Sequence, residues 1–320
     1  MASGTLFTYG TTNVDSLLAT TLSAIRKTLQ DAIFQKIPLF MWLDSKQRLS
    51  QAGGASIITP LMFGKNTTAG AYSGYGTLDT TPQEGITAAQ WRWKQYFTSI
   101  SISGSEEMQN AGENGLIRLL EAKVKQAELS LRDRLGIDAW AATQVSSRLE
   151  ALPVVVATAN SVADISQTAN SWWQAQVTAS GSFAAQGLSD MRLLFNNIAK
   201  QSLSGGAPDY LCGTQSVYEF YEGSLQPQQR FSDSKMASAG FQNVNYKGAT
   251  FTWDPNVPSG NLFMLSSDAL SLVVHSQRNF VTTPFVKPSN QDARVAQILW
   301  MGNVVCDNIR RLGKLTGLTA

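Results

Sequence analysis

The stretch ENGLIRLLEAKVKQAELSLRDRLGIDAWAAT, residues 113–143, decides the fold. Apolar residues recur along it every three or four positions and would share one face of a helix; they are Leu116, Leu120, Val124, Ala127, Leu131 and Leu135. Acidic residues precede basic ones by four positions at Glu121 and Glu128, a spacing typical of an exposed helix face. Only Gly136 interrupts the pattern. Such a helix would be about 45 Å long at roughly 1.5 Å per residue. The stripe alone predicts either a supporting strut or an ordinary long core helix.

Two extended segments precede this helix. Residues 55–63 read as a strand, residues 64–79 (GKNTTAGAYSGYGTLD) as a polar loop tip, and residues 90–103 (QWRWKQYFTSISIS) as a returning strand. Because an isolated two-stranded hairpin is marginal in water, an arm this long predicts contact with another subunit. An ordinary hairpin within a sheet is the alternative. Ser103 and Glu106 then have the spacing of a helix capping box.

The amino-terminal region has two parts. Residues 1–15 are polar and Gly/Thr-rich and predict a flexible arm, and residues 14–34 predict an amphipathic helix. Pro38 should end that region, because proline cannot continue a helix. Residues 39–43 (LFMWL) are apolar enough to require cover from their own domain or from a neighbouring chain.

Short elements follow Leu149. Paired tryptophans stand out in a polar stretch at 170–174 (NSWWQ). We expect a short buried run at 152–160, helices at 188–202 and 216–221, strands at 209–214 and 244–253, a turn at 254–260, and two short strands or one bent one at 261–275.

Residues 292–315 have apolar residues on both faces and predict a long, central, buried strand. A strand from the end of the chain would then pack near the helix in its middle. The domain built on that helix should therefore be discontinuous, with the 150–270 region inserted as a second domain.

Composition limits the function classes. The 320 residues are 43% hydrophobic and 15% charged with a net charge of +2, which indicates globular material with no demand for a nucleic-acid or membrane-surface partner. No signal peptide and no apolar run of a membrane span's length is visible. Cys212 and Cys306 read as small buried residues, and the sequon at Asn66 carries no expectation.

Enzyme chemistry finds little support. A single histidine, His275, excludes sites that need several, and a Cys–His hydrolase would have to combine it with Cys212 or Cys306. We keep that soluble hydrolase as a remote alternative. Gly64-Lys65 lacks the rest of a phosphate loop, and the S-x-x-K spacing at Ser232 lacks its companion motifs. We therefore expect no catalytic, cofactor or metal site.

The order of elements resembles a known family, the tailed-bacteriophage major capsid proteins, whose shell fold is shared with encapsulins and the herpesvirus capsid floor. The resemblance covers nearly the whole chain. Three segments are similar to capsid segments from many tailed phages: 170–174, 246–263 (from Tyr246 through WDP to Phe263) and 291–317. These are packing and turn motifs, so they point to a fold and a role and not to catalysis.

The resemblance implies an α+β fold with an amino-terminal arm, an extended β-hairpin loop, a long spine helix, a peripheral domain and an axial domain. The corresponding ranges are 1–50 for the arm, 51–104 for the extended loop, 105–150 for the spine helix and peripheral domain, 151–270 for the axial domain, and 271–320 for the return strands and tail.

The implied role is an icosahedral capsid subunit that self-assembles into hexamers and pentamers around double-stranded DNA in a virion built in the bacterial cytoplasm. The implied partners are further copies, a separate scaffolding protein (only about fifty residues precede the extended loop), a portal protein, and weakly held DNA. A decoration protein is compatible with the resemblance, and no membrane is involved. The near relative in fold, an encapsulin-type nanocompartment shell, stays open.

Nine residues are candidates for contacts between subunits: Lys65, Tyr72, Tyr75, Trp91, Trp93, Trp172, Trp173, Arg310 and Arg311. Some family members make a Lys–Asn cross-link between subunits, and Lys65 lies at the matching loop tip. The sequence identifies neither the asparagine nor the acid that such a bond needs, so a solvated loop lysine is the alternative.

Overall fold

A computed structural model describes residues 37–46, 48–109, 119–202, 206–225 and 244–320. Residues 1–36 of the expected amino-terminal arm, which include the predicted helix at 14–34, and the polar segment 226–243 lie outside these residues. The chain divides into two compact units. Of the described residues, the first contains those within 97–131 and 282–299, and the second contains those within 37–96, 132–281 and 300–320. The domain boundaries expected from the resemblance stay predictions.

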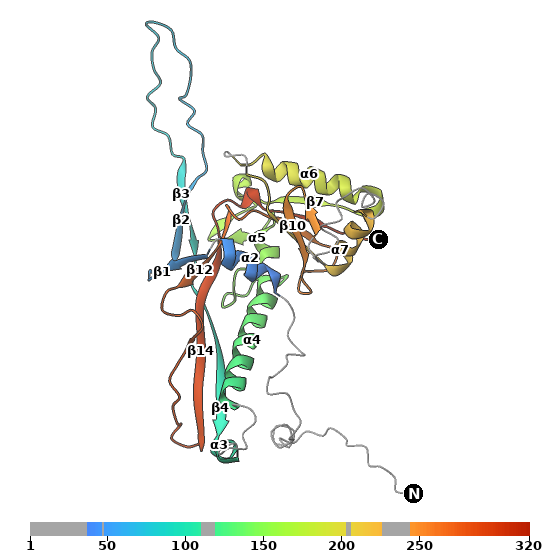
Figure 1. The fold of residues 1–320 in the computed structure, drawn as a ribbon. Helices are drawn as coiled ribbons and strands as arrows, with labels where there is room; N and C mark the ends of the chain where they lie inside the picture. The colour runs from blue at the N-terminus through green and yellow to red at the C-terminus, as the bar shows by residue number, and fades with distance from the viewer. Residues whose placement is uncertain (1–36, 47, 110–118, 203–205, 226–243) are drawn as a thin grey trace. The chain divides into compact units, whose positions relative to one another are not determined.

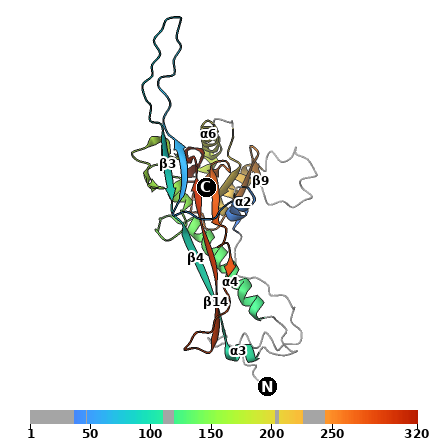
Figure 2. The ribbon, with the colours of Figure 1, turned by 90° about the vertical axis from the view of Figure 1, so that its left-hand side faces the viewer.

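The first unit combines a helix with two paired strands. Its elements are α3 (Gly104–Gln109), most of β4 (Lys94–Ser103), the first part of α4 (Leu119–Ala139) and the first part of β14 (Ala293–Cys306). β4 pairs with β14, and α4 lies beside them (Figure 1, Figure 2). Ile100 and Ile102 on β4 and Ala127 and Leu131 on α4 are buried, which confirms the predicted stripe over this part of the helix.

The capping box is confirmed. The Ser103 amide donates to Glu106 Oε2 at 3.0 Å, and the Glu106 amide donates to Ser103 Oγ at 3.2 Å. Lys123 on α4 also donates to Glu106 Oε2, at 2.9 Å, and so ties the start of α3 to α4.

In the described residues α4 ends at Ala139, four residues before the predicted end. Gly136 does not interrupt it. A Cβ at Gly136 would lie about 3.0 Å from Ile37 Cγ2, so the glycine allows close packing of the chain that leads into α2 (Pro38–Lys46). Pro38 begins this helix. Leu39 and Leu43 are fully buried and Trp42 stacks on Tyr210 at 4.6 Å, so these three residues are covered within their own unit, whereas Met41 in the same apolar run is 67% exposed.

The hairpin is shorter than predicted. β2 (Ile57–Met62) pairs antiparallel with β3 (Ile86–Trp91), and residues 63–85 form the loop between them (Figure 1). The prediction that 90–103 is one returning strand is wrong beyond Trp91. The strand breaks at Arg92-Trp93, and β4 then pairs with β14 instead of β2. β4's own alternation of buried and exposed residues suits that second sheet.

β14 is the central strand of a five-stranded sheet, as its two apolar faces predicted. It lies between β12 (Leu270–His275) and β13 (Val281–Thr282), and β1 (Arg48–Gln51) pairs with the far edge of β12. The strand ends at Cys306, and not near Leu315. A short 3-10 helix, η4 (Ile309–Arg311), then leads to β15 (Gly313–Thr316) in another sheet.

That second sheet has six strands in the order β7-β15-β11-β8-β10-β9. They are β7 (Gln176–Ala179), β8 (Tyr210–Gly213), β9 (Val244–Tyr246), β10 (Ala249–Trp253), β11 (Leu262–Leu265) and β15. The predicted strand 244–253 is two strands, because Lys247 and Gly248 both adopt positive φ and turn the chain. The predicted strand at 209–214 and the pair of strands within 261–275 are confirmed.

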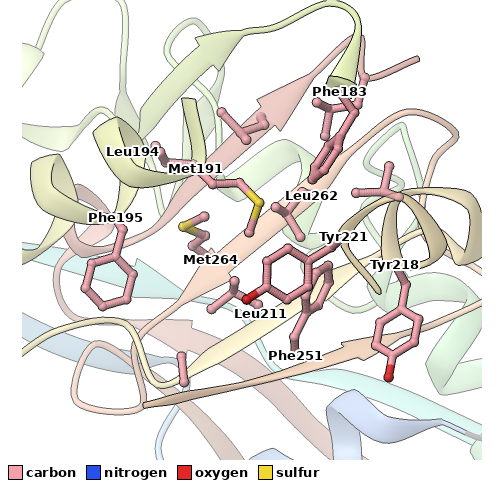
Figure 3. Close-up of a cluster of buried hydrophobic side chains, with 14 of the residues drawn as sticks. Phe183, Met191, Leu194, Phe195, Leu211, Tyr218, Tyr221, Phe251, Leu262 and Met264 are labelled. Atoms are coloured by element: carbon pink, nitrogen blue, oxygen red, sulfur yellow. The ribbon is translucent and has the colours of Figure 1, made fainter. Parts of the chain in front are cut away.

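Two helices complete this sheet's core: α6 (Leu188–Ala199) and α7 (Gln215–Leu225), both predicted. Met191, Leu194 and Ile198 on α6 are fully buried and join Phe251 and Leu262 of the sheet in one cluster (Figure 3). Phe195, Tyr218 and Tyr221 extend the cluster. This core is filled by its own chain.

The segment from 150 to 187 consists of short elements. They are α5 (Leu152–Val155), the small hairpin β5 (Ser161–Val162) and β6 (Ile165–Ser166), the 3-10 helix η1 (Ser171–Trp173) and the π-helix η2 (Phe183–Gly187) before α6. The predicted buried run at 152–160 is one helical turn followed by an irregular chain, because Pro153 starts a helix that Val156 already leaves.

Candidate assembly surface

The loop between β2 and β3 is almost entirely exposed. It carries apolar side chains that are exposed in the described structure: Tyr72, Tyr75 and Leu78 in the loop, and Met62 and Ile86 at the strand ends. Tyr75 is 107% exposed, so none of the described residues reduces its access to water. Loops of more than about 15 residues without regular structure are uncommon in compact domains and usually functional. These side chains are available to a partner.

Local hydrogen bonds shape the loop. Asn66 Oδ1 accepts from the amide and hydroxyl of Thr68, and Asp79 Oδ1 accepts from the amide and hydroxyl of Thr81. The bonds from Thr81 hold the pKa of Asp79 below its usual range. Thr67 Oγ1 donates to Gln83 Oε1 across the loop at 2.9 Å. The two legs of the loop are therefore tied together, with Lys65 exposed beside them.

The two tryptophans at the base of the hairpin differ in exposure. Trp91 is 1% exposed and lies in the core of its own unit, whereas Trp93 is partly exposed. Trp93 Nε1 donates to the Gly54 carbonyl at 2.9 Å, and its ring meets His275 edge-on at 5.7 Å. Trp91 thus has no surface left for a neighbouring subunit.

The NSWW pair divides in the same way. Trp173 is 2% exposed and its Nε1 donates to the Val162 carbonyl at 3.2 Å. Trp172 is partly exposed and stacks on Phe63 at 5.4 Å. Trp173 therefore acts within its own chain, and Trp172 contacts the hairpin at the loop end of β2.

The two arginines near the carboxy terminus also separate. Arg311 is 7% exposed and pairs with Asp268 at 3.1 Å, whereas Arg310 is exposed. Because Trp91, Trp173 and Arg311 are buried in their own unit, we drop them as contact candidates. Lys65, Tyr72, Tyr75, Trp93, Trp172 and Arg310 stay candidates.

Four further apolar residues of the hairpin are exposed and were not predicted as contact candidates: Met62, Phe63, Leu78 and Ile86. Leu78 was visible as an apolar residue in a polar loop. Met62, Phe63 and Ile86 lie at the ends of the strands. There the alternation of side chains between the two faces of the hairpin does not indicate which face is covered by another part of the protein.

Two buried carboxylates carry the polar network near α4. Asp138 is 1% exposed, accepts from Tyr96 Oη and Arg134 Nε, and lies 3.7 Å from Arg148. Asp254 is fully buried and accepts from Trp140 Nε1 at 3.0 Å. Burial raises the pKa of Asp254 above its usual range. These groups fix the end of α4 and the turn after β10 within one unit.

The arrangement of Cys306 and His275 is unsuited to nucleophilic catalysis. Cys306 lies opposite Leu270 in the β12–β14 pair, and His275 is five residues farther along β12. At about 3.4 Å per residue their backbones are roughly 17 Å apart. Both Cys212 and Cys306 are fully buried, and this burial raises the pKa of each thiol, which suppresses the reactive thiolate. The geometry thus argues against the hydrolase alternative.

Among the described residues no group of three or more His, Cys, Asp or Glu side chains could hold a metal ion. None of the helices within that same part of the chain is long and apolar enough to cross a membrane.

The chain matches no protein-family model and no curated protein sequence. Solved structures do match it. The capsid subunit of cyanophage A-1(L) is 14% identical, with a TM-score of 0.70 over 93% of this chain and 97% of that one. The fold is that of a capsid shell subunit. The capsid of a native GTA particle matches with a TM-score of 0.66 at 8% identity, over 97% of this chain and 99% of that one. The encapsulin of a holo-SrpI complex from Synechococcus elongatus gives 0.62 at 8% identity, over 97% and 96%.

Proposed function

We propose that this chain is the structural subunit of the icosahedral capsid of a tailed bacteriophage, assembling into hexamers and pentamers around double-stranded DNA. The observation that carries the proposal is the end-to-end likeness to a phage capsid subunit, which spans 93% of this chain and 97% of that one.

The hairpin supports the same role. A two-stranded hairpin is marginal alone in water, and this one adds exposed Tyr72, Tyr75 and Leu78. Burying such side chains on neighbours stabilises an assembly by about 1.5–3 kcal/mol for each large apolar side chain fully covered. Repeated around a ring of copies, that gain favours closed shells over monomers.

The proposal also includes further binding partners and the location of the protein. They are a separate scaffolding protein, a portal protein, an outer decoration protein, and packaged DNA held by weak non-specific contacts. The net charge of +2 suits a container that must later release its DNA, since a strongly basic lining would hold it. Assembly would take place in the cytoplasm of the host bacterium, and the mature location would be the virion.

An encapsulin-type compartment is the second candidate, favoured by the likeness to the Synechococcus encapsulin at a TM-score of 0.62. The contents of the purified particles distinguish a virus shell from a compartment. Particles purified after nuclease treatment should protect DNA if the chain forms a virus shell, and protein cargo if it forms a compartment.

The test of assembly uses the fully exposed Tyr75. The chain is expressed alone and with a candidate scaffold, and particle mass and shape are measured by light scattering and negative-stain microscopy. We expect closed particles or discrete pentamers and hexamers. Tyr75→Ser should reduce their yield without lowering the unfolding free energy of the subunit, because Tyr75 buries nothing in its own chain.

Ser73→Ala at the same loop tip is the matched control and should assemble as the wild type does. Deletion of Lys65–Gly76 should stop or destabilise assembly. A monodisperse monomer or dimer under all conditions would overturn the proposal. A normal yield of closed shells from the deletion would refute the assignment of the hairpin as the assembly arm.

A further inference from the structure

Buried contacts fix the base of the β2–β3 hairpin at the bend after β3. Asn303, fully buried on β14, donates to the Arg92 carbonyl at 2.9 Å. Next to it Lys94 is 5% exposed, donates to the Ser146 carbonyl and pairs with Glu150 at 3.3 Å. These buried contacts hold the bend between β3 and β4, so this bend is a fixed point for the hairpin.

The second leg is tied to the same point. Trp93 Nε1, in the bend, donates to the carbonyl of Gly54, just before β2. Gly54 has φ +111, in the region that favours glycine. Both legs of the hairpin are therefore anchored at one place. Anchoring at one place leaves the direction of the arm to contacts farther along it.

One segment, residues 161–173, which we call the bracket, makes three further contacts: two with the hairpin beyond the bend, at Gln90 and Phe63, and one with Arg92 in the bend. The Gln90 amide donates to the Ala163 carbonyl at 3.2 Å, and Phe63 stacks on Trp172 at 5.4 Å. Arg92 Nη2 lies 3.7 Å from Asp164 Oδ1, with both side chains more than half exposed. In contrast to the buried anchor, these contacts are few and partly or largely solvent-exposed.

The bracket has an unusual backbone. Ala163 and Asp164, the two turn residues between β5 and β6, have φ of 54° and 64°. Hairpin turns of two residues with positive φ at both positions favour Asn-Gly, and alanine is disfavoured there. Such a conformation persists only where the surroundings fix it, and it concentrates at sites that position other groups.

The surroundings do fix it. Trp173 Nε1 donates to the Val162 carbonyl, and fully buried Gln167 accepts from the Asn160 amide and donates to the Val155 carbonyl. The strained turn thus points the Ala163 carbonyl at the Gln90 amide from a rigid base. The bracket is the rigid partner, and the hairpin is the element it holds.

We propose that the bracket is a positioning device that holds the hairpin arm in one direction before any neighbouring subunit is present. A preorganised arm loses less conformational freedom on association than a free one, which strengthens binding without any new contact. Because the bracket contacts are few and partly exposed, they are weak enough to be adjusted when the arm meets its neighbour. The positioning itself is a property of the single chain, and its consequence for assembly rests on the proposed function.

Hydrogen exchange of the full-length chain tests the positioning. Samples are compared at equal low concentration after light scattering has shown equal mass. In Trp172→Ala we expect the amides of 57–59, 61–62 and 86–91 to exchange at least tenfold faster than in the wild type (Pro60 has no amide hydrogen). Amides of 262–265, in the six-stranded sheet, should keep their wild-type rates. Trp253→Ala, which removes an exposed tryptophan of the same unit, is the control and should leave the hairpin amides unchanged.

Phe63→Ala removes the same stacking pair from the hairpin side and should give the same acceleration even if Trp172→Ala fails to fold. Ala163→Gly relieves the strained turn and should keep the hairpin protected. Wild-type exchange rates at 57–62 and 86–91 in Phe63→Ala would overturn the proposal.

Assembly distinguishes this proposal from the functional one. Fast exchange in both variants, with a wild type that never forms particles, would support the bracket and reject the capsid function. Particles from the wild type with unchanged exchange in the variants would support the function and reject the bracket.

Discussion

Replacing Asn303 by alanine should destabilise the second unit more than any other single polar substitution on β14. Its amide group is fully buried and makes three hydrogen bonds. Nδ2 donates to the Arg92 carbonyl at 2.9 Å, and Oδ1 accepts from the amides of Glu150 at 3.1 Å and Val304 at 2.9 Å. One side chain thus joins the β3–β4 bend, the segment after α4 and the central strand.

The magnitude follows from the groups left without partners. Asn303→Ala removes the acceptor of the Glu150 amide and the donor to the Arg92 carbonyl, two groups that are partly buried. Each unsatisfied buried polar group costs about 1–3 kcal/mol, so the loss should be about 3 kcal/mol. That is roughly a hundredfold change in the folding equilibrium and a large part of a typical total stability.

Urea unfolding followed by tryptophan fluorescence measures the loss, with the sample kept as dispersed subunits. Gln297→Ala, at an exposed position of the same strand, is the control and should stay within about 0.5 kcal/mol of the wild type. A loss below about 1 kcal/mol in Asn303→Ala would refute the assignment of this residue as the anchor of the hairpin base.

Three further outcomes are expected. Burial raises the pKa of Asp254 in the folded chain, so its contribution to stability is present below its unfolded pKa of about 3.9 and is lost as pH rises through the folded value. Asp254→Asn should therefore reduce the decrease of the unfolding free energy with rising pH, as measured by urea unfolding at several pH values. An unchanged pH dependence would contradict this. The hydrogen bond from Lys123 holds the pKa of Glu106 below its usual range. Its contribution to stability therefore has the opposite sign: it is present above the unfolded pKa of about 4.3 and is lost as pH falls through the lower folded value. Glu106→Gln should cost about 0.5 kcal/mol at pH 7, discounted for its partial exposure, and the cost should shrink as pH falls, as the same urea titration measures. Ile198→Ala empties a fully buried position of the cluster in Figure 3 and should cost about 2–5 kcal/mol in the same urea assay, whereas Leu193→Ala, at an exposed position of the same helix, should cost less than about 1 kcal/mol.

The periodicity of apolar residues predicted the elements that have one buried and one exposed face. It failed where a turn interrupts a segment that would otherwise continue as a strand. Helix α6 was predictable because Met191, Leu194 and Ile198 repeat at helical spacing and are all buried. The break after Trp91 was not, because Gln90–Ser103 is β-favouring throughout and the bend depends on a hydrogen bond from distant Asn303. The turn at Lys247-Gly248 was visible only as a single glycine.

The candidate surface was predictable in place and not in detail. The glycine-rich loop 64–79 indicated an exposed tip, and Tyr72 and Tyr75 are indeed exposed. The sequence could not show whether Trp172 or Trp173 is the exposed one. Adjacent side chains in a 3-10 turn point in different directions, and tertiary packing determines which of them is buried.

Substitutions should be able to change the unfolding free energy of this chain and its yield of assembled particles independently, because different residues determine the two quantities. The cluster around Phe251 is closed within one unit, so truncating it lowers the unfolding free energy and acts on assembly only through the loss of folded subunits. Tyr75 buries nothing in its own chain, so its loss acts on assembly alone. Asn303 lies between these cases, since it supports the core and also anchors the base of the arm. A variant at Asn303 should therefore lower both quantities together, and correcting its assembly yield for the folded fraction should still leave a deficit that Ile198→Ala does not show.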